Sequence, residues 1–262
     1  MVDPLPMPPI ELRRAVGGDE SGFDNPGGGL VYDHIPQAAY ERVFDFGCGC
    51  GRLARQLMQQ RAAKPRRYLG IDLHKAAVDW ASANLSPLDR NFRFEHFDVH
   101  NRQFNPTAMQ PQRAFPTGEK FTLAVANSVF THVLEADVAF YLREIARILA
   151  RDGYFVSSWF FFDKRSFPMM QEFQNALYIN LDDPTNAVIY DLDFARALFR
   201  GAGLTIIQVL PPHLRGFQWL LTAVLADGRA EAEFPPDVAP YGLARPPLSM
   251  GLHRAGIQPP VP

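Results

Sequence analysis

The chain has 262 residues, of which 47% are apolar and 21% are charged, so it can bury a large core and is not a disordered protein. Its 26 basic and 28 acidic residues leave a net charge of −2, which argues against a protein whose main role is to grip nucleic acid. Two cysteines are too few to staple a secreted fold, and no segment has the pattern of an export signal or a membrane span, so we expect a cytoplasmic protein.

The composition changes along the chain and predicts three regions. Residues 1–40 are rich in proline and glycine and predict an arm, with one helical turn near Ile35–Tyr40 and a disordered leader over residues 1–15. Residues 41–226 alternate between strand and helix patterns and predict the main domain. Residues 227–262 are rich in proline and lack periodicity, which predicts a tail that is loose or lies over a surface.

Strands alternate with helices through the middle region. The predicted strands are Arg42–Phe46, Tyr68–Asp72, Phe92–Phe97, Phe121–Ala126, Gly153–Phe161, Leu204–Leu210 and Phe217–Leu225. The predicted helices are Arg52–Arg61, Lys75–Leu85, Asp137–Leu149 and Leu192–Phe199. Asp191 stands at the start of the last helix, where an acid is favourable. The alternation predicts an α/β fold with a mostly parallel sheet and helices on both faces, and the last two strands predict an antiparallel hairpin.

A glycine-rich turn, Gly47-Cys48-Gly49-Cys50-Gly51, follows the first strand and precedes a helix. Glycine lets the chain turn tightly and lets a ligand approach the backbone at the helix N-terminus. A dinucleotide fingerprint would need Gly-x-Gly-x-x-Gly, and Arg52 stands at its sixth position, which disfavours a nicotinamide cofactor. A plain strand-to-helix turn and a metal-binding cysteine pair are the alternatives, but no second Cys/His pair at usable spacing supports a metal.

Polar residues mark the ends of four successive predicted strands. Asp45 lies inside the first strand, Asp72 ends the second, Asp98 follows the third and Asn127 follows the fourth. The carboxyl ends of parallel strands converge on one crevice, where an acid can accept both hydroxyls of a ribose. Any one of these could be an ordinary loop residue, but the four together predict a shared binding site.

These segments together resemble a class I S-adenosylmethionine (SAM)-dependent methyltransferase. The resemblance rests on VFDFGCGCGRLARQL, YLGID, the strand Phe92–Phe97 with its acid Asp98, FTLAVANSVFTHV and DGYFVSSWF, in that order. The FGCGCGR and SVFTH segments are similar to bacterial type 11/12-like methyltransferase domains. The family implies a Rossmann-like seven-stranded sheet in the order 3-2-1-4-5-7-6, with strand 7 antiparallel, and this agrees with the predicted hairpin.

The resemblance implies SAM as the cofactor and S-adenosylhomocysteine (SAH) as the product. The residues at its cofactor-binding positions are Asp45, Gly47, Cys48, Gly49, Asp72, Leu73, Asp98, Val99, Asn127 and Ser128. The glycine loop matches the part that holds the methionine, Asp72 the ribose-binding acid, and Asp98 the acid beside the adenine amino group. In similar domains an N-terminal arm closes the site. Extra helical structure covers the acceptor, at the position that residues 163–190 occupy in this chain.

The segment after the fourth strand argues against a nucleic-acid amine as the methyl acceptor. DNA amino-methyltransferases have an Asn/Asp-Pro-Pro-aromatic motif after the fourth strand, whereas this chain has Asn127-Ser128-Val129-Phe130 there. We therefore expect O-methylation of a small molecule, sugar or glycolipid, with no nucleic-acid partner and no membrane span. A hydroxyl acceptor benefits from a general base, for which His132 is the first candidate and His213 the second, although either could be structural.

Several alternatives remain open. The apolar content of residues 163–190 suits a lid, a lipid-like or aromatic acceptor, a homodimer face or a satellite core. Gln218-Trp219 could form a sugar-stacking face, and Trp219 could equally be core. A SAM- or nucleotide-binding interaction subunit without catalysis is the second functional hypothesis, and a nicotinamide oxidoreductase is a weaker third.

Overall fold

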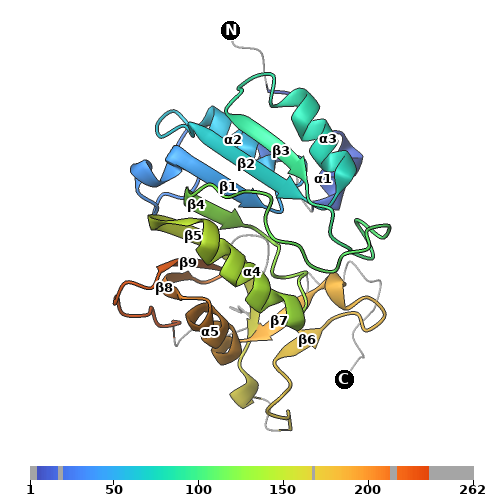
Figure 1. The fold of residues 1–262 in the computed structure, drawn as a ribbon, viewed down its shortest axis with the longest axis vertical. Helices are drawn as coiled ribbons and strands as arrows, with labels where there is room; N and C mark the ends of the chain where they lie inside the picture. Colours follow the sequence, from blue (N-terminus) through green and yellow to red (C-terminus); the bar gives the residue numbers. More distant parts are fainter. Residues whose placement is uncertain (1–4, 17–19, 167–168, 213–216, 236–262) are drawn as a thin grey trace, which may run out of the picture.

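The protein is described by a computed structural model over residues 5–16, 20–166, 169–212 and 217–235, in which helices flank a central sheet (Figure 1). The strands of the main sheet are β1 Arg42–Phe46, β2 Arg67–Asp72, β3 Phe92–His96, β4 Phe121–Ala126, β5 Leu149–Phe162, β8 Leu204–Leu210 and β9 Trp219–Leu225. The α-helices are α1 Ile10–Ala15, α2 Arg52–Gln59, α3 Lys75–Asn84, α4 Glu135–Ile148 and α5 Leu192–Gly201. Among the described residues no helix is long and apolar enough to cross a bilayer.

The main sheet has the strand order β3-β2-β1-β4-β5-β9-β8. The first five of these strands are parallel, whereas β9 is antiparallel to both of its neighbours. The predicted order 3-2-1-4-5-7-6 is confirmed, because β8 and β9 are the sixth and seventh strands of the sequence prediction. The carboxyl ends of the parallel strands therefore lie along one edge, where this fold places its ligands.

A short β-ribbon, which the sequence pattern does not predict, extends the far end of β5. Its strands are β6 Ala176–Tyr178 and β7 Val188–Asp191. β7 is parallel to the last residues of β5, and β6 is antiparallel to β7. The expectation of extra helical structure over residues 163–190 is therefore wrong for the described part of this segment. Besides these two strands it has only two single 3-10 turns. The described residues of this segment do not form a small separate hydrophobic core either, because four of their large apolar side chains are exposed: Met169, Phe173, Ile179 and Leu181.

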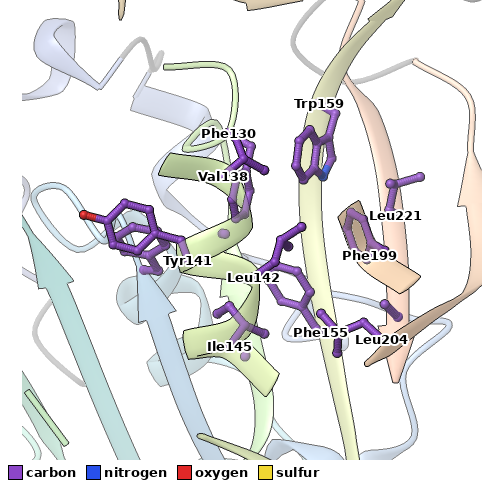
Figure 2. Packing of buried hydrophobic residues seen from close by; sticks show 14 of the residues in the cluster. Phe130, Val138, Tyr141, Leu142, Ile145, Phe155, Trp159, Phe199, Leu204 and Leu221 are labelled. Carbon is purple, nitrogen blue, oxygen red and sulfur yellow. The ribbon is translucent and has the colours of Figure 1, made fainter. Parts of the chain in front are cut away.

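Helices cover both faces of the sheet and divide the core in two. Apolar side chains of α4 and α5 pack on one face, and those of α2 and α3 pack on the other. On the first face the rings of Phe130 and Trp159 stack with centroids 4.4 Å apart, and Leu142 and Phe155 lie beside them (Figure 2). These contacts fix the loop that follows β4 against β5, which matters because that loop borders the site.

The N-terminal segment packs against α2 through polar contacts. Residues 10–15, for which the sequence predicts a disordered leader, form α1, and the side chains of Leu12 and Val16 pack with Phe23 and Cys50. The guanidinium of Arg55, only 2% exposed, donates hydrogen bonds to Asp24 Oδ1 at 2.6 Å and to the Pro6 carbonyl. The helical turn predicted near residue 37 is confirmed as a 3-10 helix, η2 Gln37–Glu41.

Candidate functional site

A cavity of about 1240 Å³ opens at the carboxyl ends of the parallel strands. It exceeds the roughly 300–1,000 Å³ of ordinary small-molecule pockets, so it has room for a nucleoside and a second ligand. The predicted site residues that line it are Asp45, Gly47, Cys48, Gly49, Asp72, Leu73, Val99, Asn127, Ser128 and His132. The structure therefore brings together residues that come from four strand ends.

Two of the predicted residues are placed differently. Asp98 is exposed, accepts a hydrogen bond from Asn105 Nδ2 at 3.0 Å, and borders a separate cavity of about 430 Å³. Its neighbour Val99 lines the main cavity, since successive residues of an extended chain point to opposite sides. The role of Asp98 beside an adenine stays a prediction. His213 lies outside the described residues.

The glycine loop after β1 depends on backbone conformations that other residues rarely adopt. Gly47, Gly49 and Gly51 have φ values of +81°, +53° and +83°. A Cβ on Gly47 would lie 2.4 Å from Val129 Cγ2, and one on Gly49 would lie 2.5 Å from Val16 Cγ1. The loop is therefore enclosed by the segment after β4 on one side and by the N-terminal arm on the other.

A Gly49→Ala substitution should lower thermal stability and at the same time weaken the binding of SAH, the product that the sequence resemblance implies. Alanine at this φ costs about 1–2 kcal/mol, and its Cβ would push Val16 away from the loop. Thermal unfolding with and without SAH measures both effects. Gly118→Ala is the matched control, because a Cβ there meets nothing within 4 Å. Equal melting temperatures for the two variants would contradict this account of the loop.

Asp72 connects the end of β2 to the glycine loop. Its Oδ2 accepts the Gly49 N–H at 2.7 Å, and its Oδ1 accepts the His74 N–H at 2.7 Å. Burial raises the pKa of this carboxyl, and the two N–H donors partly oppose that shift. An ionised carboxylate accepts at about four lone-pair positions, so Asp72 can receive two further hydroxyl groups from a ligand.

Asp45 is a buried acid that lines the same cavity. Only 2% of it is exposed, and it accepts a hydrogen bond from Tyr68 Oη at 2.6 Å. Burial raises the pKa of Asp45 to about 7; the Tyr68 hydroxyl opposes this shift and the charge of Asp72 adds to it. A cationic ligand would favour the charged form of this carboxyl.

The two cysteines of the loop are buried and free. Burial raises the pKa of Cys50 to about 12 and that of Cys48 well above its ordinary value, so both thiols stay protonated at neutral pH. Metals bind the thiolate form. Within the described residues no group of three His, Cys, Asp or Glu side chains is arranged to hold a metal ion.

A polar network borders the cavity beyond β4. Ser128, at φ +56°, donates its N–H to Ser158 Oγ at 2.7 Å. Both serine hydroxyls donate to Gln218 Oε1, at 3.0 Å from Ser128 and 2.7 Å from Ser158. Nearby, Asn127 Nδ2 donates to Tyr32 Oη at 2.6 Å. These hydrogen bonds connect the segment after β4, strand β5, the residue before β9 and the N-terminal arm along one wall of the cavity.

Sequence reasoning missed Tyr32 and Ser158 as members of this site. No local pattern marks them, because Tyr32 meets a partner 95 residues away and Ser158 lies within an apolar strand. Gln218 does line the cavity, but Trp219 is 1% exposed and belongs to the core, so a sugar-stacking face on Trp219 is wrong.

His132 lines the cavity with a defined ring orientation. Its Nδ1 lies 2.9 Å from the carbonyl oxygen of Thr185, which belongs to the segment between β6 and β7. A carbonyl oxygen only accepts, so Nδ1 carries the proton in this bond, and Nε2 of the neutral ring keeps its lone pair. The imidazole can therefore accept a proton at Nε2.

Comparison with known proteins gives concordant results. A family model described as "Methyltransferase domain" matches residues 20–209. A SAM-dependent methyltransferase from Clostridium acetobutylicum is 13% identical, with a TM-score of 0.55 over 83% of this chain and 96% of that one. One from Leishmania major is 15% identical, with a TM-score of 0.50 over 72% of this chain and 66% of that one.

An O-methyltransferase of neocarzinostatin biosynthesis has a similar fold. It is 14% identical, with a TM-score of 0.50 over 73% of this chain and 51% of its own, and its structure holds SAH and 1,4-dihydroxy-2-naphthoic acid. At such identities the solved structures show a common fold.

Proposed function

Because the chain belongs to the class I SAM-dependent methyltransferase family, we propose that it transfers a methyl group from SAM to a hydroxyl of a small molecule, sugar or glycolipid. SAM is the cofactor and SAH the product. The observation that carries the proposal is the position of Asp72, a carboxylate at a strand end that two backbone N–H groups hold beside the glycine loop.

The residues of the cavity fit the cofactor by chemistry. Asp72 has lone pairs for the ribose hydroxyls, and the Gly47–Gly49 loop with Asp45 suits the methionine end. When bound, SAM supplies an electrophilic methyl group on a sulfonium. The cavity is larger than one ligand needs, so the acceptor would occupy the part bordered by Ser128, Gln218 and His132.

The N-terminal arm is proposed to cover the cofactor. Val16, Tyr32 and His34 come from this segment and line the cavity, and Val16 packs against the glycine loop. Residues 182–186 of the 163–190 insertion line the cavity as well, which supports a lid role for that segment toward the acceptor. Both segments would exclude water from the reacting groups.

An Asp72→Ala variant should bind SAH about tenfold to a hundredfold more weakly, because it removes charge-assisted hydrogen bonds to the ribose. Isothermal titration calorimetry with SAH measures the loss. Asp79→Ala is the control, since Asp79 is an exposed surface partner of Lys75. Full SAH affinity in Asp72→Ala would remove the ribose assignment, and binding of NAD without SAM or SAH would overturn the proposed function.

The acceptor proposal rests on the wall that holds Gln218. The oxygen of its carboxamide is occupied by two serine hydroxyls, so its Nε2 can donate to an oxygen of the acceptor. A methyl-transfer screen with labelled SAM over sugars, glycolipids and phenolic metabolites tests the proposal. A protein that binds SAH but methylates none of these classes would instead fit a non-catalytic cofactor-binding subunit.

A further inference from the structure

His132, the first candidate for the general base, lies in the irregular segment between β4 and α4. Such a segment lacks the regular hydrogen bonds of a helix or strand, so the direction of its side chains depends on contacts with neighbouring elements. The ring of His132 has one such contact, because its Nδ1 donates to the Thr185 carbonyl at 2.9 Å. Thr185 belongs to the segment that joins β6 to β7, so the β6–β7 ribbon sets the direction in which Nε2 points.

The same ribbon holds the backbone on both sides of His132. The Val188 N–H donates to the carbonyl of Thr131 at 2.8 Å. The Tyr190 hydroxyl donates to the carbonyl of Val133 at 2.5 Å. Three consecutive residues are therefore bound to one short ribbon, two through their carbonyl groups and one through its imidazole. An imidazole held at its backbone as well as at Nδ1 keeps one orientation toward the cavity.

Tyr190 acts from behind the wall of the cavity. Among the described residues, His132 and Val133 line the cavity, whereas Tyr190 does not line it and is fully buried. Its ring is fixed by Trp159 and Phe194, whose ring centroids lie 5.6 Å and 6.3 Å from its own. Burial raises the pKa of the Tyr190 phenol, so the hydroxyl keeps the proton that it donates.

From these contacts we propose that Tyr190 is a positioning residue for methyl transfer: its hydroxyl holds the Val133 carbonyl and thereby keeps the imidazole of His132 directed at the acceptor. The proposal rests on the proposed function, because it takes His132 as the base for a hydroxyl acceptor. In the transfer, the acceptor oxygen gives its proton to Nε2 and forms its bond to the methyl carbon, while the S–CH3 bond breaks and SAH leaves. A base displaced by about 1 Å can lose about a hundredfold in rate.

A double-mutant cycle measures the coupling between Tyr190 and His132. Tyr190→Phe removes only the hydroxyl, so it should lower the single-turnover rate about fivefold to fiftyfold, while the affinity for SAH stays within about twofold. In the His132→Ala background the same substitution should change the rate by less than about twofold, because the group that it positions is gone. Equal slowing in both backgrounds would overturn the proposal.

Tyr178→Phe is the matched control for Tyr190→Phe. Tyr178 lies in β6 of the same ribbon and packs on the same core, but within the part of the chain that the structure describes its hydroxyl makes no hydrogen bond. Its substitution should leave the single-turnover rate unchanged. A loss of rate as large as that of Tyr190→Phe would show that the ribbon responds to any lost hydroxyl, and would overturn the assignment to Tyr190.

The tautomer of His132 gives a second readout that needs no acceptor. Nitrogen NMR of the neutral imidazole, assigned by the signal that His132→Ala lacks, should place the proton on Nδ1 in the wild-type protein. Tyr190→Phe should raise the share of the Nε2–H tautomer, because the ring loosens from the Thr185 carbonyl. An unchanged tautomer would overturn the proposal even where the rate falls.

The same measurements separate this proposal from the proposed function. A slow His132→Ala variant together with a normal Tyr190→Phe variant would overturn the role of Tyr190 and leave the base in place. Normal turnover in His132→Ala would remove the base, and the positioning role with it. If the wild-type protein bound neither SAM nor SAH, the proposed function itself would fail.

Discussion

Replacement of His132 with alanine should slow methyl transfer about a hundredfold to ten-thousandfold while the affinity for SAH stays unchanged. A hydroxyl acceptor must lose its proton as the methyl group arrives, and Nε2 of His132 is the acceptor atom that the Thr185 carbonyl leaves available. Single-turnover rates with the acceptor found in the labelled-SAM screen measure the loss. Added imidazole should restore part of the rate in the variant.

His100→Ala is the matched control for His132→Ala. His100 lines the same cavity, and its Nδ1 likewise lies 3.1 Å from a carbonyl oxygen, that of Ala108. It follows β3 and not β4, so it lies away from the proposed acceptor wall, and its removal should not slow methyl transfer. Normal turnover in His132→Ala would exclude this histidine as the base.

The stability of the SAM-free protein should fall as pH rises through about 7, because of Asp45. In the folded protein its carboxyl keeps a proton up to about pH 7, whereas in the unfolded chain it loses the proton near 3.8. Between these values the folded state binds more protons, so rising pH favours unfolding. A pKa moved from 3.8 to about 7 corresponds to a loss of roughly 4 kcal/mol above pH 7.

Asp45→Asn isolates this effect, since asparagine keeps the shape and a hydrogen-bonding oxygen for Tyr68 without a charge. Urea unfolding at pH 5 and pH 9 should show the variant gaining stability over the wild type as pH rises. A constant difference between the two proteins at all pH values would refute the argument. SAH affinity of the wild type should change in the opposite direction, rising toward pH 7, because the ammonium group of the ligand favours the ionised carboxyl.

The sequence predicts those elements whose signal is local. β1 and β4 begin and end at the predicted residues, because each is a mostly apolar run with a polar or glycine boundary. Asp191 is confirmed as a helix N-cap, since its carboxylate accepts the Phe194 N–H at 3.0 Å. The shared cavity could also be predicted, because strand order alone brings Asp45, Asp72 and Asn127 to one edge.

Features that depend on contacts between distant segments could not be predicted from local patterns. β5 begins at Leu149, four residues before the predicted start, because α4 passes directly into extended backbone without a loop. The β6–β7 ribbon forms because β5 continues far enough to offer β7 a partner. The hydrogen bond from Arg52 Nη2 to the Val16 carbonyl likewise becomes visible only once the arm and α2 are placed together.

The strand order has a consequence for how the protein is made on the ribosome. β9 lies between β5 and β8 but is the last of the described strands to be synthesised, so residues 155–159 of β5 lack their β9 partner until residues 219–225 have emerged. This edge of β5 carries Phe155 and Trp159, and its free N–H and C=O groups can pair with another nascent chain. The newly made protein is therefore most prone to aggregate in the interval between emergence of α5 and insertion of β9.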